Sequence, residues 1–146
     1  MIERQLLVES FTNRLAFEMG QSVVALAKQK NLAIGVAVAR LNHTVFLYLD
    51  DGMPADKHNW LRRKSNVAKH FEESSLAVKH DLAKKEMSLS GTFGLDEKDF
   101  TNSGGSIPIV AAATGLVGTI TVTGLPDVDD HQLIVDALSG EFTFTR

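Results

Sequence analysis

The segment from residue 57 to residue 71 carries the densest set of side chains that could bind a ligand. It contains five cations, two histidines and no acidic residue: Lys57, Arg62, Arg63, Lys64 and Lys69, with His58 and His70. Pro54 stands just before it and suits the first turn of a helix, so we expect these side chains on one helix. An uncompensated run of positive charge indicates an anionic ligand or partner.

Trp60, Val67 and Phe71 fall on one face of this helix, with Lys64 among them and Arg63 at the border. A cation inside an apolar stripe must find an anion, a carbonyl or an aromatic ring, or extend to solvent. One interpretation is a pocket in which Trp60 covers a flat apolar ligand while Arg63 and Lys64 bind its carboxylates or phosphates. The other is a solvated basic helix with the stem of Lys64 packed along the core edge. The sequence leaves both open.

A glycine pair and one histidine are further candidates. Gly104 and Gly105 could offer backbone N–H groups to an anion, or they could form a tight turn before a strand. His131 lies on the apolar side of the last predicted helix, where it could be a metal or haem ligand, a proton donor or a hydrogen-bonded residue at the core edge. The candidate ligand-binding residues are therefore Trp60, Arg63, Lys64, Gly104, Gly105 and His131. No catalytic residue and no metal site is predicted.

Composition narrows the class of protein. The chain has 146 residues, 44% hydrophobic and 23% charged, which fits one globular domain over residues 1–146. The absence of cysteine excludes disulfides, thiolate catalysis and Cys-based metal sites. The motifs H-E-x-x-H, G-x-S-x-G and the P-loop are absent. The net charge of −3, the lack of an 18-residue apolar run and the lack of a signal-peptide pattern predict a cytoplasmic protein with no nucleic-acid or membrane partner.

Hydrophobic periodicity predicts the elements that position these residues. We expect helices over residues 4–30, 54 to 71 or 73, and 75–85, and a last helix capped by Asp127. We expect strands over residues 32–40, 44–49, 107–113 and 117–123, a short strand over 87–93, a loop over 95–105 and a tail over 141–146 that adds an edge strand. The first two strands have a short connection, so they should form an antiparallel hairpin.

The first helix and the hairpin also predict how the elements pack. Phe17 and Val24 lie nearly opposite the main apolar stripe of the first helix, so either the same subunit or a neighbouring one covers this second spot. The hairpin strands are apolar almost throughout, which indicates a sheet covered on both faces. Positions 33, 35, 37 and 39 are small and share one face, so a helix can approach closely. These patterns predict a single α+β domain and a homo-oligomer.

The C-terminal half resembles a known family. The run Gly104-Gly105-Ser106-Ile107-Pro108-Ile109, followed by residues 115–126 and an acid-led helix, is similar to the haem-degrading, HbpS-like family, which includes GlcG and the C-terminal domain of PduO. The segment Trp60-Leu61-Arg62-Arg63-Lys64, with Phe71, Ser74-Ser75 and Asp130-His131, is most similar to its bacterial and fungal UPF subgroup. The resemblance covers about residues 10–140. The chain departs from the family at Ser103, where histidine is expected, and at Ile107, where phenylalanine is common.

The resemblance implies a profilin-like layout, with an antiparallel five-stranded sheet and helices on both faces, in a compact homo-oligomer. It also implies binding of haem or another tetrapyrrole, with haem breakdown in some relatives. Our hypothesis is a cytoplasmic, oligomeric binding protein for a flat anionic ligand such as haem or a corrinoid, with weak haem-degrading activity as a further option. The alternative is a non-enzymatic interaction or scaffold protein that presents the basic helix to an acidic partner.

Overall fold

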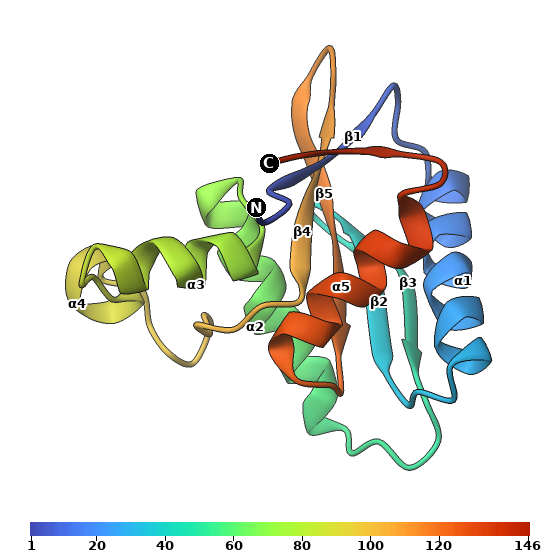
Figure 1. The fold of residues 1–146 in the computed structure, drawn as a ribbon, viewed down its shortest axis with the longest axis horizontal. Helices are drawn as coiled ribbons and strands as arrows, with labels where there is room; N and C mark the ends of the chain where they lie inside the picture. The colour runs from blue at the N-terminus through green and yellow to red at the C-terminus, as the bar shows by residue number, and fades with distance from the viewer.

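The computed structural model covers residues 1–146 and is built on a six-stranded sheet with the order β3-β2-β5-β4-β1-β6 (Figure 1). In chain order, the elements are β1 (Gln5–Val8), α1 (Asn13–Gln29), β2 (Gly35–Arg40), β3 (Thr44–Leu49), α2 (Asp56–Phe71), α3 (Ser75–Lys84), α4 (Leu89–Phe93), β4 (Ser106–Ala111), β5 (Gly115–Thr123), α5 (Asp127–Leu138) and β6 (Thr143–Thr145). Neighbouring strands run antiparallel except β1 and β4, which run parallel.

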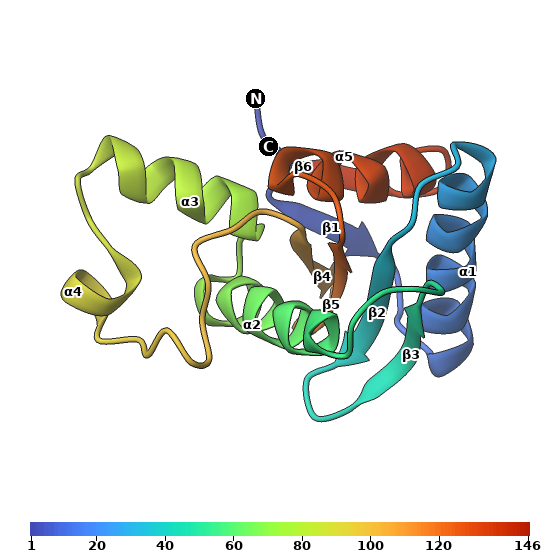
Figure 2. The ribbon, with the colours of Figure 1, turned by 90° about the horizontal axis from the view of Figure 1, so that it is seen from below.

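Helices cover both faces of the sheet (Figure 2). Helices α1 and α5 pack together on one face, over a core that includes Val36, Val38, Ile120 and Val122. Helix α2 packs on the other face, across β4 and β5 and beside β2. Helices α3 and α4 project away from the sheet (Figures 1 and 2), and they form a small apolar cluster together with Val67 of α2. The predicted α+β class, with helices on both faces, is confirmed.

The predicted antiparallel sheet of five strands is wrong, because residues 5–8 form an additional strand instead of the start of a helix. Leu6 and Val8 are buried while Leu7 is not, which is the alternation of a strand. This strand lies between β4 and β6, and its parallel pairing with β4 makes the sheet mixed. Helix α1 therefore begins only at Asn13, and the hydroxyl of Thr12 caps it by accepting the Leu15 N–H at 3.0 Å.

Two further local predictions are corrected. Residues 87–93 contain no strand: Ser88 accepts the Gly91 N–H at 2.9 Å and opens the short helix α4, and Gly94 ends it in the left-handed conformation. Asp127 does not cap α5 through its side chain, because the N-cap position is Pro126. The predicted hairpin, the helices at 56–71 and 75–84, the loop before β4 and the C-terminal edge strand are confirmed.

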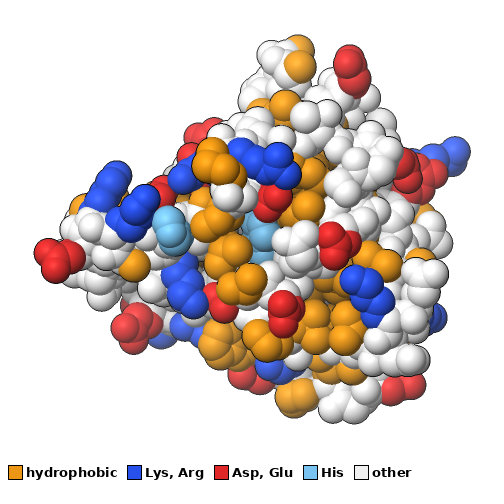
Figure 3. All heavy atoms as spheres, in the orientation of Figure 1, with side chains coloured by type: hydrophobic (Ala, Val, Ile, Leu, Met, Phe, Trp, Pro, Cys, Tyr) orange, Lys and Arg blue, Asp and Glu red, His pale blue; other side chains and the backbone are white.

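The face of the molecule that carries α5 offers no basic patch. Helix α5 has four aspartates and no lysine or arginine, and acidic, basic and apolar side chains are interspersed on this face (Figure 3). No helix has the length and apolar character needed to cross a bilayer. An anionic ligand is therefore better sought on the opposite side of the sheet, where α2 lies.

Candidate functional site

Helix α2 separates two hollows, and each is bordered by a different flank of the helix. The first, which we call the hairpin groove, has a volume of about 480 Å³ and lies between α2 and the β2–β3 hairpin. The second, the Trp60 cleft, has a volume of about 380 Å³ and lies between α2, α3 and the start of α5. Both are within the size range of small-molecule sites.

The Trp60 cleft brings together several of the predicted site residues. Trp60 and Lys64 line it together with Ser103, which precedes the glycine pair. The Trp60 ring has two cations over it, Lys57 Nζ at 5.9 Å and the Arg63 guanidinium at 5.2 Å from the ring centroid. Arg63 itself does not line the cleft. The sequence named Trp60, Lys64 and the glycine pair as separate candidates, and the structure places the first two beside the residue that precedes the pair.

Lys64 is turned inward and paired within the protein. Its residue is 2% exposed, and Nζ donates to Asp130 Oδ2 at 2.8 Å and to the Val122 carbonyl oxygen at 2.9 Å. Burial lowers the pKa of Lys64 and raises the pKa of Asp130 to about 6, because each charged form loses hydration, although their attraction opposes both shifts. The Lys64 ammonium is thus committed to Asp130 and to the β5 backbone.

The glycine pair closes the loop over this ion pair. The Gly104 N–H donates to Asp127 Oδ2 at 3.0 Å, and Lys79 Nζ lies 2.7 Å from the same oxygen. Gly105 has φ +126°, and a Cβ there would lie 2.8 Å from Lys64 Nζ and 2.6 Å from a backbone oxygen. Only glycine lets the chain approach so closely. The backbone N–H of Gly104 is therefore bound by the protein's own carboxylate.

His131 lies outside both hollows. It is 2% exposed, and Nε2 is 3.0 Å from Glu3 Oε1, while Nδ1 has no hydrogen-bond partner. Burial lowers the pKa of His131, because the charged imidazolium loses hydration there. No group of three or more His, Asp or Glu side chains is placed to hold a metal ion. The geometry of His131 is that of a residue that joins α5 to the N-terminal segment.

The hairpin groove has a different chemistry, because its lining contains cations and histidines but no acid. The seventeen lining residues are Ala37, Ala39, Arg40, Leu41, Asn42, His43, Thr44, Ala55, His58, Asn59, Leu61, Arg62, Ser65, Asn66, Lys69, Thr119 and Thr121. Thr119 already shares a hydrogen bond of 2.6 Å with Ser65, and the Thr121 hydroxyl shares one of 2.8 Å with Ser106. The groove thus has small side chains and satisfied hydroxyls below its cationic walls.

The cations of the groove have few partners of opposite charge. The side chains of Lys69 and His58 make no hydrogen bond or ion pair within the protein. Arg40 donates to the Phe11 carbonyl oxygen at 2.9 Å, which is an uncharged partner. Only Arg62 has an acidic partner, Asp99, at 2.8 Å. The groove therefore keeps two cations without an acidic partner, whereas two of the three lysines of the Trp60 cleft are paired with aspartates.

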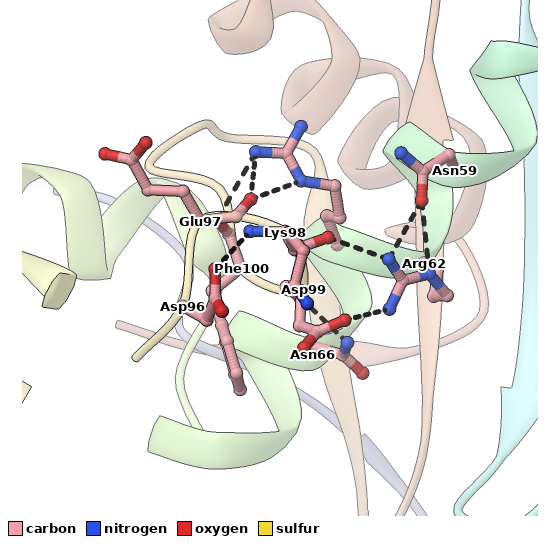
Figure 4. A network of polar contacts seen from close by, with 9 residues as sticks. Asn59, Arg62, Asn66, Asp96, Glu97, Lys98, Asp99 and Phe100 are labelled. Atoms are coloured by element: carbon pink, nitrogen blue, oxygen red, sulfur yellow. Dashed lines mark hydrogen bonds and ion pairs between the residues drawn. The ribbon is translucent and has the colours of Figure 1, made fainter. Parts of the chain in front are cut away.

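Residues 95–100, which we call the strap, run beside α2 and are fastened to it by hydrogen bonds (Figure 4). Arg62 donates to the Lys98 carbonyl oxygen at 2.8 Å, and the Asn66 amide donates to the Asp99 carbonyl oxygen at 2.8 Å. Arg63 donates twice to the Glu97 carbonyl oxygen, at 2.6 and 3.0 Å. Arg63, one of the predicted ligand-binding residues, and Arg62 thus hold the strap.

The groove was missed in the sequence, although a signal for it was present. Its residues come from the second flank of α2 and from the hairpin, and they form no known motif. The small residues 35, 37 and 39 indicated that a helix would lie against that face of the hairpin. Combined with the acid-free run of α2, this pattern indicates a positively charged hollow between the two.

The comparisons with known proteins agree on family and fold. Residues 11–139 match the family described as Haem degrading protein HbpS-like. A UPF0303 protein of Zymomonas mobilis is 39% identical over 94% of this chain and 74% of its own length. The crystal structure of the Ybr137w protein has a TM-score of 0.82 at 23% identity, covering 92% of this chain and 80% of that one.

A further solved structure, a PduOC:haem complex, has a TM-score of 0.73 at 13% identity and covers 94% of this chain and 98% of that one. At such identities the structural likeness concerns the fold alone. The match of residues 11–139 and the identity with the Zymomonas protein go further. On these grounds the chain belongs to the haem-degrading, HbpS-like family.

Proposed function

We propose that the protein binds a flat anionic ligand of the haem or tetrapyrrole type, and that the ligand lies in the hairpin groove. The observation that carries this proposal is the lining of the groove, which has three cations, two histidines and no acid around a floor of small side chains. A hollow with this charge attracts anions, and its volume of about 480 Å³ is within the range of small-molecule sites.

The residues of the groove fit the parts of a haem. Ala37 and Ala39 leave room for a flat ring. The hydroxyls of the floor are hydrogen-bonded to one another, so a bound ring would leave no polar group beneath it without a partner. Arg62 and Lys69 would bind the propionates, and His58 offers an imidazole without a competing hydrogen bond. A bound haem would supply redox-active iron.

The comparisons support the ligand class rather than the location. The family is described as haem-degrading, and one protein of the same fold was crystallised with haem. Because Ser103 stands where the family resemblance implies histidine, the glycine loop of this chain offers no imidazole. The groove histidines are the alternative source.

The Trp60 cleft and the scaffold hypothesis have less support. In the cleft, Lys64 and Lys79 are each paired with an aspartate of α5. A scaffold would need the cations of α2 free for an acidic partner, whereas Arg63 holds the strap and Lys64 is buried against Asp130. The groove retains the unpaired cations that either an anionic ligand or an acidic partner requires.

Haemin titration followed by absorbance tests the proposal. We expect a Soret shift for the wild type, a changed spectrum for His58→Ala, and wild-type spectra for Trp60→Ala. His80→Ala is the matched control, because this exposed histidine lies on α3 outside the groove. No Soret shift in the wild type would reject haem binding. A shift lost in Trp60→Ala but kept in His58→Ala would move the site to the cleft.

We also propose that the protein is a homo-oligomer. Phe17 on α1 is 48% exposed and stacks edge-on against Phe46 of the edge strand β3, with 5.7 Å between ring centroids. Leu47 on the same strand is 45% exposed, and such an apolar edge is normally covered. Light scattering should give a multiple of 15.9 kDa, and a monomer mass at micromolar concentration would contradict this proposal.

A further inference from the structure

We infer that the Arg62 end of the hairpin groove is a carboxylate subsite, and that the protein's own Asp99 occupies it until a carboxylate-bearing ligand enters. This inference rests on the proposed function, because it assumes that an anionic ligand enters the groove. It adds the chemical group that the ligand must carry and the residue that competes with it.

The contacts of Arg62 are those of a carboxylate site that is already filled. Arg62 lines the groove, yet Nη1 donates to Asp99 Oδ1 at 2.8 Å, and Nη2 donates to the Lys98 carbonyl oxygen at 2.8 Å (Figure 4). The Asn59 amide oxygen accepts from Nη2 at 2.9 Å and fixes the guanidinium plane. Arginine is suited to planar recognition of carboxylates, and Asp99 supplies one from within the chain.

Asp99 can leave Arg62 at low cost. The side chains of Arg62 and Asp99 are 47% and 49% exposed, so solvent screens the ion pair and can hydrate both groups after separation. The strap does not depend on this pair, because Arg63 still binds the Glu97 carbonyl oxygen and Asn66 still binds the Asp99 backbone. The Asp99 side chain can therefore turn away while the strap stays in place.

Competition follows from this arrangement. A ligand carboxylate that binds Arg62 in place of Asp99 must compete with the Asp99 carboxylate. A ligand without a carboxylate cannot replace this interaction, so the Arg62 end favours ligands that carry one. Of the three groove cations, only Arg62 has such an internal competitor, since Lys69 is unpaired and Arg40 binds an uncharged carbonyl. The Arg62 end thus selects by charge, and the rest of the groove selects by shape.

The test compares two charge-removing variants of the strap. Asp99→Asn removes the competing carboxylate. Glu97→Gln removes an equal charge two residues earlier in the strap, where the side chain makes no bond to Arg62. Haemin and haemin dimethyl ester are the probes, because the ester has no carboxylate. We expect Asp99→Asn to bind haemin up to about fivefold more tightly than the wild type, as the loss of a surface ion pair allows. Glu97→Gln should bind haemin as the wild type does, and the ester should not distinguish the three proteins.

The outcomes separate this inference from the proposed function. If the wild type binds haemin and Asp99→Asn binds it no more tightly, the carboxylate subsite is rejected and the groove proposal stands. If the wild type binds no haemin, the proposed function fails, and glutarate titration decides the subsite. In ¹⁵N spectra the Arg62 Nε–H signal should then shift at lower glutarate concentration in Asp99→Asn than in the wild type. An unmoved signal in both proteins would overturn the inference.

Discussion

The two hollows beside α2 are both lined by cations of that helix, but only the Trp60 cleft also has acidic side chains in its lining. Each is bordered by cations of the same helix, Lys57 and Lys64 on the cleft flank and Arg62 and Lys69 on the groove flank. In the Trp60 cleft, acids from α5 enter the lining and neutralise the deepest cation. In the hairpin groove, the facing strands contribute alanine and threonine, and the charge stays available to a ligand.

The difference shows that a count of cations along a helix does not locate an anion site. What decides is whether the elements packed against each flank carry acids. Asp130, in the first turn of α5, reaches Lys64 in the middle of α2 at 2.8 Å. The pair also contacts β5 through the Val122 carbonyl oxygen and the turn before α5 through the Leu125 N–H. The Lys64–Asp130 pair in the cleft thus connects α2 to β5 and α5, whereas the groove flank of the same helix stays open to a ligand.

The largest expected effect comes from breaking the Lys64–Asp130 ion pair. Lys64→Met should lower the free energy of unfolding by about 3–5 kcal/mol, because it leaves the Asp130 carboxylate buried without its partner. Urea denaturation measures this change. Lys57→Met is the matched control, since Lys57 lines the cleft without an ion pair, and it should change stability by less than about 0.5 kcal/mol. An unchanged midpoint for Lys64→Met would mean that the pair contributes nothing.

The cost of Lys64→Met should also depend on pH. Burial already raises the pKa of Asp130 to about 6, and loss of the ammonium removes the attraction that opposes this rise. A carboxyl group whose pKa is higher in the folded than in the unfolded state adds stability that is fully present below the unfolded pKa. This stability is lost as the pH rises through the folded pKa. The variant should therefore be less destabilised at pH 5 than at pH 8. Equal destabilisation at both pH values would contradict the stranded carboxylate as the cause.

A smaller effect is expected at the glycine loop. Asp127→Ala should cost about 1–2 kcal/mol, because it removes the acceptor of the Gly104 N–H and the partner of Lys79. Asp129→Ala is the control, because Asp129 lies in the same first turn of α5, is exposed and makes no side-chain bond. If both variants lose the same stability, the helix dipole and not the loop explains the effect.

In the groove, a cation should matter for the ligand and not for the fold. Lys69→Met should keep the denaturation midpoint and weaken haemin binding by about 1 kcal/mol, the scale of one charge-assisted contact near the surface. Lys84→Met, in the last turn of α3, is the control and should change neither quantity. Loss of stability in Lys69→Met would show that Lys69 is structural, which would weaken the contrast between the two hollows.

The smallest effect concerns salt. Raising sodium chloride from 50 to 500 mM should weaken haemin binding severalfold, because the groove cations are screened by solvent ions. The difference in unfolding free energy between Lys64→Met and the wild type should stay nearly constant, since a buried pair is screened much less. Salt-independent haemin binding would place the propionates away from these cations.

Local patterns predicted most of the elements, and non-local pairing explains the failures. The hairpin, α2, α3, β4 and β5 have periodicities that need no distant partner. Residues 5–8 run directly into the apolar period of α1, and their strand exists only because Leu6 pairs with Ile109 and Phe144. Residues 87–93 read as a strand because the capping role of Ser88 was not recognised.

The same distinction holds for the candidate sites. The sequence named Trp60, Lys64 and the glycine pair as separate candidates, and their helix and turn were predicted well, but it did not indicate that they lie beside one another. It could not assign Asp130 to Lys64 or Asp127 to Gly104, since these contacts span 66 and 23 residues and depend on how α5 packs. The groove needed the same knowledge of which helix flank faces the hairpin.

The position of β1 has a consequence for how the chain acquires its fold during synthesis. Its two neighbours in the sheet, β4 and β6, are encoded near the other end of the chain. At about 5–20 residues per second, roughly 7–27 s separate the emergence of β1 from that of β6. Until β4 emerges, which takes most of that interval, the apolar segment around Leu6 has no native strand partner and is open to chaperone binding.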